Sequence, residues 1–340
     1  MKEVYVFGAG ASHASGRTPL GPNLIWDYYM SCSTMYKIIN GKPDSTEHKK
    51  EFINLEKFLE LFEQVYPERK GEKNSYLKAL DEGMDYQPPS FHYGNKKYYF
   101  DEMVRILKDK GNQEGIELIR QLTLEHIGGI SIDSDNSLYR RFVSGLKTKV
   151  PEQISIISFN FDCLLCDDFK NEIYFDYLIK FDADLSHRAY DKHDRIALIK
   201  PNGSLDWAIC SKCNRITLLL PLIAQQSYNN RYCKIDNTCH ANLKPLIYLP
   251  YEGKSELMNI LWNKAKMCLS QADIVTIIGY SFPEYDKEVM EIFQQCLSSR
   301  IALNIVDVDK DVCERIKDLF PVVKNIKISL DGFQGYLRSI

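Results

Sequence analysis

The chain has 340 residues, 44% of them hydrophobic, and a formal net charge of −3. This length allows one large or two ordinary domains, and the hydrophobic content is enough for a sizeable core. The slightly acidic balance gives no basic footprint for nucleic acid, and no apolar run reaches the ~18 residues of a membrane helix. The first residues enter a strand without a cleavable signal pattern, so we expect a cytoplasmic protein with reduced cysteines.

The first predicted strand, Glu3–Phe7, runs into a glycine-rich turn. The turn contains Gly8, Ala9, Gly10, Ala11 and Ser12. Glycines in such a turn let the backbone approach a pyrophosphate, and a following helix N-terminus offers free N–H groups to it. The third glycine of the dinucleotide pattern Gly-x-Gly-x-x-Gly is replaced by His13. The turn alone therefore fits a nucleotide site or a tight turn without a ligand.

A long helical insertion is predicted from residue 23 to residue 150. Apolar residues recur at helical spacing in three stretches, around Phe58, Met103 and Ile119. A connection of this length far exceeds an ordinary loop, so we expect a helical subdomain.

The other predicted strands are mostly continuous apolar runs. They are Ile154–Phe159, Ile196–Lys200, Leu246–Leu249, Ile274–Ile278, Ile301–Val306 and, with less apolar character, Asn325–Leu330. Runs without polar alternation are typical of strands buried on both faces, and therefore of a parallel sheet. We expect an α/β fold with a Rossmann-like parallel sheet and helices on both faces, in one domain spanning residues 1–340.

Polar or glycine-containing segments follow several of these strands. They contain Asn160 and Asp162, Asn202 and Gly203, Gly279 and Ser281, and Asp307. The C-terminal ends of parallel strands face the ligand crevice, where glycine with a small hydroxyl residue at the start of a helix suits phosphate and an acid suits ribose hydroxyls. Each segment alone also fits ordinary structure: an Asx cap after the second strand, a Pro-Asn-Gly turn, or Asp307 as the N-cap of a helix over 312–319.

Four cysteines are grouped between the third and fourth of the predicted strands, at Cys210, Cys213, Cys233 and Cys239. Thiolates suit zinc, and the first pair has the Cys-x-x-Cys spacing of a zinc knuckle. The second pair is wider, so His240 is an alternative to Cys239 as the fourth ligand. Four reduced thiols or a redox pair are the other interpretations, but no thioredoxin-like context accompanies the first pair. We expect a structural zinc-ribbon module at residues 208–241, without an open position for catalysis.

The order of these elements resembles the sirtuin superfamily: Gly-Ala-Gly-x-Ser, Asn-x-Asp, Gly-Ser-x-x-Trp, paired cysteines, Gly-Tyr-Ser and a strand ending in Asp. The sequence is most similar to the divergent bacterial sirtuin-like group, often found in antiphage defence. The resemblance implies an NAD site. It places Gly8, Ala9, Gly10 and Ser12 at the phosphates, Asn160 and Asp162 at the nicotinamide ribose, Gly203 beside the cofactor, Gly279 and Ser281 on the adenosine side, and Asp307 at a ribose. It also implies that Cys210, Cys213, Cys233 and Cys239 bind zinc.

Two departures from the sirtuin pattern bear on activity. Sirtuin deacylases follow the first motif with Ile-Pro-Asp-Phe-Arg, where this chain has Arg17–Gly21, which argues against peptide deacylation. The catalytic His of the family precedes a Gly, where this chain has Asn202 before Gly203. A carboxamide cannot take a proton as imidazole does, and general-base catalysis contributes ~10²–10⁴-fold.

The expected function is NAD hydrolysis at the nicotinamide–ribose bond, with catalytic roles for Asn160, Asp162 and Asn202 and an activity weakened by Asn202. His13 is an alternative base. A non-catalytic sensor of NAD or ADP-ribose, or an inactive partner subunit, is the second hypothesis, and a protein deacylase is the third. From the resemblance we also expect a homo-oligomer or a defence-system partner protein, and we expect neither membrane nor nucleic acid as a partner.

Overall fold

The computed structural model describes residues 1–16, 46–71, 73–75, 78, 100–128, 137–165, 174–184, 195–219, 232–233, 239–253 and 255–339. The chain divides into two compact units. The first contains Met1–Thr18, Ile127–Tyr248 and Gly253–Ile340, and the second contains Pro19–His126 and Leu249–Glu252. Within the described ranges, none of the helices combines the length and the apolar character that crossing a membrane requires.

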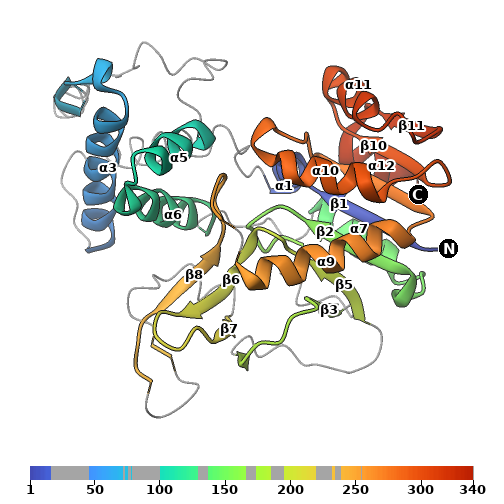
Figure 1. The fold of residues 1–340 in the computed structure, drawn as a ribbon, viewed down its shortest axis with the longest axis horizontal. Coiled ribbons are helices and arrows are strands. Elements are labelled where there is room, and N and C mark those ends of the chain that lie inside the picture. Colours follow the sequence, from blue (N-terminus) through green and yellow to red (C-terminus); the bar gives the residue numbers. More distant parts are fainter. Residues whose placement is uncertain are drawn as a thin grey trace. The chain divides into compact units, whose positions relative to one another are not determined.

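A seven-stranded sheet forms the centre of the first unit (Figure 1). Its strands are β1 (Glu3–Phe7), β2 (Ile154–Ser158), β3 (Tyr174–Asp176), β5 (Arg195–Ile199), β9 (Ile274–Ile278), β10 (Ala302–Val306) and β11 (Asn325–Ser329). They lie in the order β11-β10-β9-β1-β2-β5-β3, and every neighbouring pair is parallel. The predicted parallel α/β sheet is confirmed. Because the chain builds outward from β1 on one side and from β9 on the other, the strand order reverses between these two strands.

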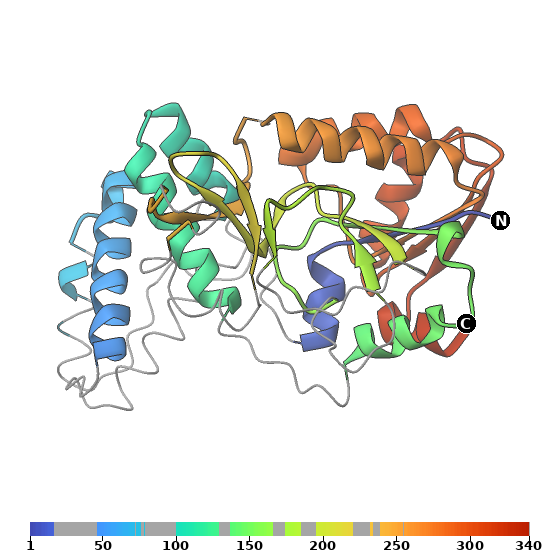
Figure 2. The ribbon, with the colours of Figure 1, turned by 90° about the horizontal axis from the view of Figure 1, so that it is seen from below.

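Helices cover both faces of this sheet, which explains why its central strands are apolar throughout (Figure 2). On one face lie α1 (Ala9–Gly16), α7 (Leu138–Leu146) and α12 (Gly332–Ser339). On the other lie α9 (Glu256–Gln271) and α10 (Lys287–Cys296). The ring of Phe7 in β1 packs edge-on against Phe142 of α7 at 5.1 Å. The helix α11 (Lys310–Leu319) packs near α10, since Phe320 at its end lies 6.3 Å from Phe293.

The first unit also contains a second sheet of four strands, in the order β4-β7-β6-β8. Its strands are β4 (Ala183–Asp184), β6 (Gly203–Cys210), β7 (Ile216–Leu218) and β8 (Leu243–Ile247). The run Leu246–Leu249, predicted as a strand of the parallel sheet, belongs here instead, because β8 is antiparallel to β6 and ends at Ile247. An apolar run reports that a strand is buried, but not which strand it pairs with.

The second unit is helical where it is described. It contains α3 (Thr46–Val65), the 3₁₀ turn η2 (Pro67–Arg69), α5 (Phe100–Asp109) and most of α6 (Gln113–Gly128). The periodic apolar residues Phe58, Leu107 and Ile119 are fully buried, as amphipathic helices require. Inside this unit, Arg120 of α6 forms a bidentate ion pair with Glu252, with N–O distances of 2.5 and 3.1 Å.

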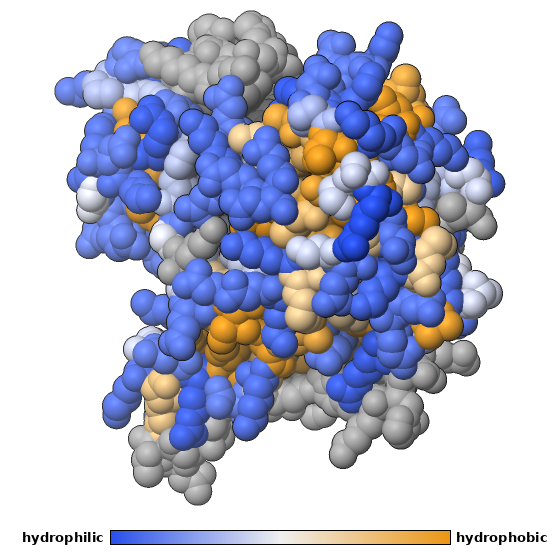
Figure 3. All heavy atoms as spheres, turned by 45° about the vertical axis from the view of Figure 1, so that its right-hand side comes forward, coloured by the Kyte–Doolittle hydropathy of each residue, from blue (hydrophilic) through white to orange (hydrophobic). Residues whose placement is uncertain are grey.

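One face of the surface is shown in Figure 3, where hydrophilic side chains predominate and apolar ones appear among them. Isolated exposed apolar residues, such as Ile260 and Met267 on α9, occur on most soluble proteins.

Candidate functional site

The turns after β1 and β9 are packed backbone to backbone at the point where the strand order reverses. The N–H of Gly8 donates to the carbonyl of Ile278 at 3.1 Å, and the N–H of Gly10 donates to the carbonyl of Gly279 at 2.9 Å. Gly279 has φ +61°, and a Cβ atom there would lie 2.3 Å from the nitrogen of Ala11. The glycines thus serve first to bring two protein backbones together at the edge where α/β folds bind ligands.

Asn160, just after β2, is tied to the glycine turn. Its Nδ2 donates to the carbonyl oxygen of Gly8 at 2.9 Å and to Oγ of Ser12 at 2.8 Å. It also lies 3.3 Å from the hydroxyl of Tyr139. Asn160 is 8% exposed and Ser12 is 1% exposed, so both belong to an ordered, largely dry network.

The partners of Asn160 determine which way its amide faces. A carbonyl oxygen can only accept, so the atom that faces Gly8 must be the NH₂ group. Asn160 therefore keeps Oδ1 as the atom that can accept a further hydrogen bond, from a hydroxyl group or a water molecule.

Asp162 and Lys200 form hydrogen bonds within the loop that follows Asn160. The Oδ1 atom of Asp162 accepts from the N–H of Leu164 at 3.1 Å, an Asx turn, and its backbone carbonyl accepts from Nζ of Lys200 at 2.5 Å. Lys200, at the end of β5, is only 1% exposed. This Asx turn agrees with the Asx cap that the sequence analysis gave as an alternative for this segment.

Asn202 lies in the turn between β5 and β6, next to the loop after β2. Its Nδ2 donates to the carbonyl of Phe159 at 3.3 Å, and its own carbonyl accepts from the N–H of Tyr248 at 2.9 Å. Gly203 follows with φ +81°, and a Cβ there would lie 2.0 Å from the carbonyl oxygen of Leu246. Gly203 is therefore required for the close approach of β6 and β8.

The loop after β9 differs from the predicted strand-to-helix turn. Pro283 and the positive φ of Phe282 (+48°) keep a helix from starting directly after Gly279. The helix α10 therefore begins only at Lys287, after the 3₁₀ turn η6 (Glu284–Asp286). Ser281 is half-buried, and its carbonyl accepts from Nη2 of Arg315 at 2.6 Å. A glycine and a serine are present as predicted, but the helix N-terminus that would reinforce them lies farther along the chain.

Tyr280 in the same loop stacks on Phe159 with ring centroids 4.2 Å apart. Its hydroxyl donates to Oδ2 of Asp286 at 2.6 Å. Burial, and then the charge and hydrogen bond of Asp286, raise the pKa of Tyr280 well above its ordinary value. The phenol therefore stays protonated and joins the loops after β2 and β9.

Asp307 lies at the end of β10 and is half-buried. Its Oδ1 accepts from the N–H of Asp309 at 3.0 Å. The N-cap of α11 is Asp309, which accepts from the N–H groups of Asp311 and Val312, so Asp307 does not cap the helix as its structural alternative proposed.

The remaining predicted residues divide between exposed and undescribed positions. His13 lies in the last turn of α1 and is exposed. The segment Arg17–Gly21 lies outside the described residues. Sequence reasoning missed Tyr139 and Lys200 as site residues, because helical spacing makes the first indistinguishable from a core aromatic and the second ends an apolar strand.

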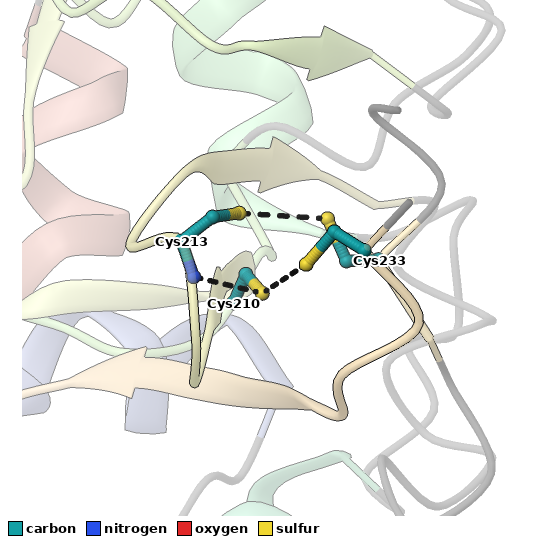
Figure 4. A group of neighbouring side chains, drawn as sticks. Cys210, Cys213 and Cys233 are labelled. Carbon is teal, nitrogen blue, oxygen red and sulfur yellow. Dashed lines mark hydrogen bonds between the residues drawn. The ribbon is translucent and has the colours of Figure 1, made fainter. Parts of the chain in front are cut away.

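The four grouped cysteines converge in the second sheet (Figure 4). Their sulfur atoms all lie within 4.8 Å of one another, with Cys210–Cys239 at 3.6 Å and Cys213–Cys233 at 3.7 Å. Four thiolates held at about 2.3 Å from one zinc ion would be separated by about 3.8 Å. The donor set and its spacing fit a closed, structural zinc site, and His240 is exposed beside it.

The backbone of the cysteine turn favours a thiolate. The N–H groups of Lys212 and Cys213 each donate to Sγ of Cys210 at 3.4 Å. Burial opposes ionisation, but these hydrogen bonds, together with those from the thiols of Cys213 and Cys239, outweigh it and lower the pKa of Cys210 to about 6. A thiolate is the form that binds zinc.

No family model matches the sequence, and no curated protein matches it. Solved structures of Sir2 proteins are similar to this chain. A Sir2 homologue in complex with NAD has 14% identity and a TM-score of 0.43, covering 72% of this chain and 77% of that chain. A Sir2 complex with the inhibitor EX-527, 2′-O-acetyl-ADP-ribose and deacetylated p53 peptide has 14% identity and a TM-score of 0.42, covering 99% and 91%. Sir2Tm bound to a propionylated peptide has 14% identity and a TM-score of 0.40, covering 100% and 91%. Likenesses at this level do not assign the chain to a family.

Proposed function

We propose that this protein binds NAD at the carboxyl edge of its parallel sheet and hydrolyses the nicotinamide–ribose bond. The observation that carries the proposal is the hydrogen bond from Asn160 to the carbonyl of Gly8. It joins the glycine turn after β1 to the polar loop after β2, beside the point where the strand order reverses. Open α/β sheets bind nucleotides at such a point, and the motif order of the sequence favours NAD over other nucleotides.

The roles are those that the resemblance of the motif order implies, together with what each side chain can donate or accept. Gly8, Ala9, Gly10 and Ser12 form the turn proposed for the phosphates, at the N-terminus of α1, where the helix dipole favours an anion. The Oδ1 atom of Asn160 accepts from a ribose hydroxyl or from the attacking water. Gly203 and Asp162 shape the loops around the nicotinamide ribose, while Gly279, Ser281 and Asp307 serve the adenosine side. These residues come from loops after separate strands of the first unit.

The chemistry proposed is a substitution at the ribose carbon. The bond to the nicotinamide nitrogen breaks and nicotinamide leaves with the electron pair, water adds to the oxocarbenium-like carbon, and the water loses a proton to solvent. Asn202 cannot accept that proton, so turnover depends on positioning and electrostatics and is slow.

A second candidate function is favoured by the same residue. With a carboxamide at position 202, the site binds NAD or ADP-ribose as a sensor or as an inactive partner subunit. A place in antiviral defence, and self-association or a defence partner, rest on the resemblance of the motif order and belong to the proposal. Zinc held by Cys210, Cys213, Cys233 and Cys239 would stabilise the second sheet and take no part in the reaction.

Calorimetric titration with NAD and with ADP-ribose, combined with an assay of nicotinamide release, tests the proposal. We expect both ligands to bind, and we expect Asn202→His to raise nicotinamide release by about tenfold or more, because an imidazole restores a base. Asn325→His is the matched control, since Asn325 is exposed at the amino end of β11.

The outcomes separate the two candidates. Binding with nicotinamide release identifies a hydrolase, whereas binding without release, even in Asn202→His, identifies a sensor. Absence of binding by either ligand at millimolar concentration overturns both.

A further inference from the structure

We propose that Tyr139 is a positioning residue that fixes the side chain of Asn160 for the reaction. The inference rests on the proposed function, and it adds a residue from α7 that the sequence motifs do not contain. Three buried polar side chains from separate elements meet here: Ser12 from α1, Tyr139 from α7 and Asn160 after β2.

The polar atoms of the three side chains lie within hydrogen-bonding distance of one another. Oγ of Ser12 lies 3.0 Å from the hydroxyl of Tyr139 and 2.8 Å from Nδ2 of Asn160. The third side of the triangle, from Nδ2 of Asn160 to the hydroxyl of Tyr139, is 3.3 Å. Each member therefore contacts both others.

The chemistry of the amide limits the direction of the hydrogens in this group. The NH₂ group of Asn160 has two hydrogens: one goes to the carbonyl of Gly8, and the other faces the hydroxyl oxygens of Ser12 (2.8 Å) and Tyr139 (3.3 Å). Either hydroxyl can be the donor of the bond between Ser12 and Tyr139, and donation by Tyr139 leaves its own lone pairs to face Asn160. The phenol is the more acidic of the two hydroxyls and the better donor, which favours donation from Tyr139 to Ser12.

Tyr139 itself is held rigidly. Its ring packs edge-on against Phe7 at 5.3 Å and against Phe333 at 5.5 Å, and the residue is 2% exposed. A hydroxyl fixed by the core holds Ser12, and Ser12 with Gly8 holds the NH₂ group of Asn160. The Oδ1 atom of Asn160 is thereby presented in one orientation, which is what a group acting on a ribose hydroxyl or a water requires.

The variant Tyr139→Phe removes only the hydroxyl and keeps the packing ring. The matched control is Tyr5→Phe, which removes another buried hydroxyl, one that donates to Glu3 at 2.5 Å and touches neither Ser12 nor Asn160. If Tyr139→Phe and Tyr5→Phe lower the free energy of unfolding equally, that loss reflects only the removal of a buried hydroxyl.

The first readout does not depend on activity. Nitrogen-15 NMR of asparagine-labelled protein resolves the side-chain NH₂ of Asn160, which is assigned by its loss in Asn160→Ala. We expect Tyr139→Phe to shift this resonance and to accelerate its hydrogen exchange by about fivefold or more, and Tyr5→Phe to leave it unchanged.

The second readout is nicotinamide release. Loss of one ordinary hydrogen bond predicts that Tyr139→Phe lowers kcat by about five- to tenfold, with KM for NAD within about twofold. In the Asn160→Ala background the same change should have no further effect, because Tyr139 acts through Asn160.

An unchanged Asn160 resonance in Tyr139→Phe overturns the inference, as does an equal fall in rate in the wild-type and Asn160→Ala backgrounds. A wild-type protein that neither binds nor cleaves NAD overturns the proposed function instead, while the NMR comparison still decides the positioning role.

Discussion

Gly8 and Gly279 pack against each other's backbone at the carboxyl edge of the parallel sheet. A Cβ at Gly8 would lie 2.5 Å from the carbonyl oxygen of Gly279, and one at Gly279 would lie 2.3 Å from the nitrogen of Ala11. Real side chains do not approach backbone atoms so closely. The turns after β1 and β9 therefore depend on glycine for their own packing, before any ligand is considered.

Gly279→Ala should destabilise the protein by roughly 2–4 kcal/mol, because it adds a backbone clash to a φ of +61°. Urea denaturation measures the effect. The control is Gly145→Ala in α7, where a Cβ would meet nothing within 4 Å. That change should be neutral or stabilising by up to about 1 kcal/mol, and equal losses in the two variants would contradict the packing argument.

A second prediction for single residues concerns Glu3 in β1. Its Oε2 accepts from Nζ of Lys149 at 2.5 Å and from the hydroxyl of Tyr5 at 2.5 Å. Burial opposes ionisation, but the hydrogen bonds and charge of Lys149 and the bond from Tyr5 outweigh it and lower the pKa of Glu3 below its ordinary 4.5.

A lowered folded-state pKa contributes stability above the unfolded pKa, and that contribution disappears as the pH falls through the folded value. The free energy of unfolding of Glu3→Gln should therefore fall below that of the wild type above about pH 5, with the gap closing as the pH drops below 4.5. Chemical denaturation across this pH range gives the measurement. Glu152→Gln, which removes an exposed carboxylate, is the comparison variant, and a gap for Glu3→Gln that widens in acid would refute the assignment.

At the scale of elements, the cysteine cluster has a small core of its own on one side of the second sheet. The strand β7 has three residues and β4 has two. The core around the cysteines is small, with Ala208, Leu219 and Leu243 as its other buried members. The same sheet also joins the main core through Trp207, Leu218 and Leu246. We therefore expect a metal ion to stabilise mainly the cysteine-containing side of the sheet, where apolar burial is small.

Metal analysis of the purified protein should give one zinc per chain. Cys239→Ser should lose the metal and lower Tm, because the sulfur of Cys239 lies 3.6 Å from that of Cys210 inside the cluster. His240→Ala should retain the metal, since His240 is exposed while Cys239 is buried. Loss of zinc from His240→Ala with retention in Cys239→Ser would reverse the choice of fourth ligand.

For the whole molecule, the strand order decides where a ligand can bind. The first unit places β1 between β2 and β9, all parallel, so that the loops after these strands leave the same edge of the sheet. Residues separated by 152 positions, Asn160 and Gly8, are thereby hydrogen-bonded. The topology brings together the residue types that the sequence presents separately.

The sequence predicted most strands of the parallel sheet because strands buried on both faces read as unbroken apolar runs. It did not predict β3, β4 or β7, which have three, two and three residues, because runs that short carry no periodicity. It also missed the eight-residue β6, whose first residues were interpreted as a Pro-Asn-Gly turn. It also assigned Leu246–Leu249 to the wrong sheet, because burial is visible in sequence and strand pairing is not.

Local chemistry was enough to single out the glycine turn, the cysteine set and the polar residues after the strands, since each depends on residue type and short spacing. Only the tertiary structure decided that Gly8, Gly203 and Gly279 pack against protein backbone. It also decided that Asn160 turns its NH₂ group to Gly8, and that Tyr139 joins this network. Those facts depend on contacts between segments far apart in the chain, and residue type and spacing do not encode which buried groups meet.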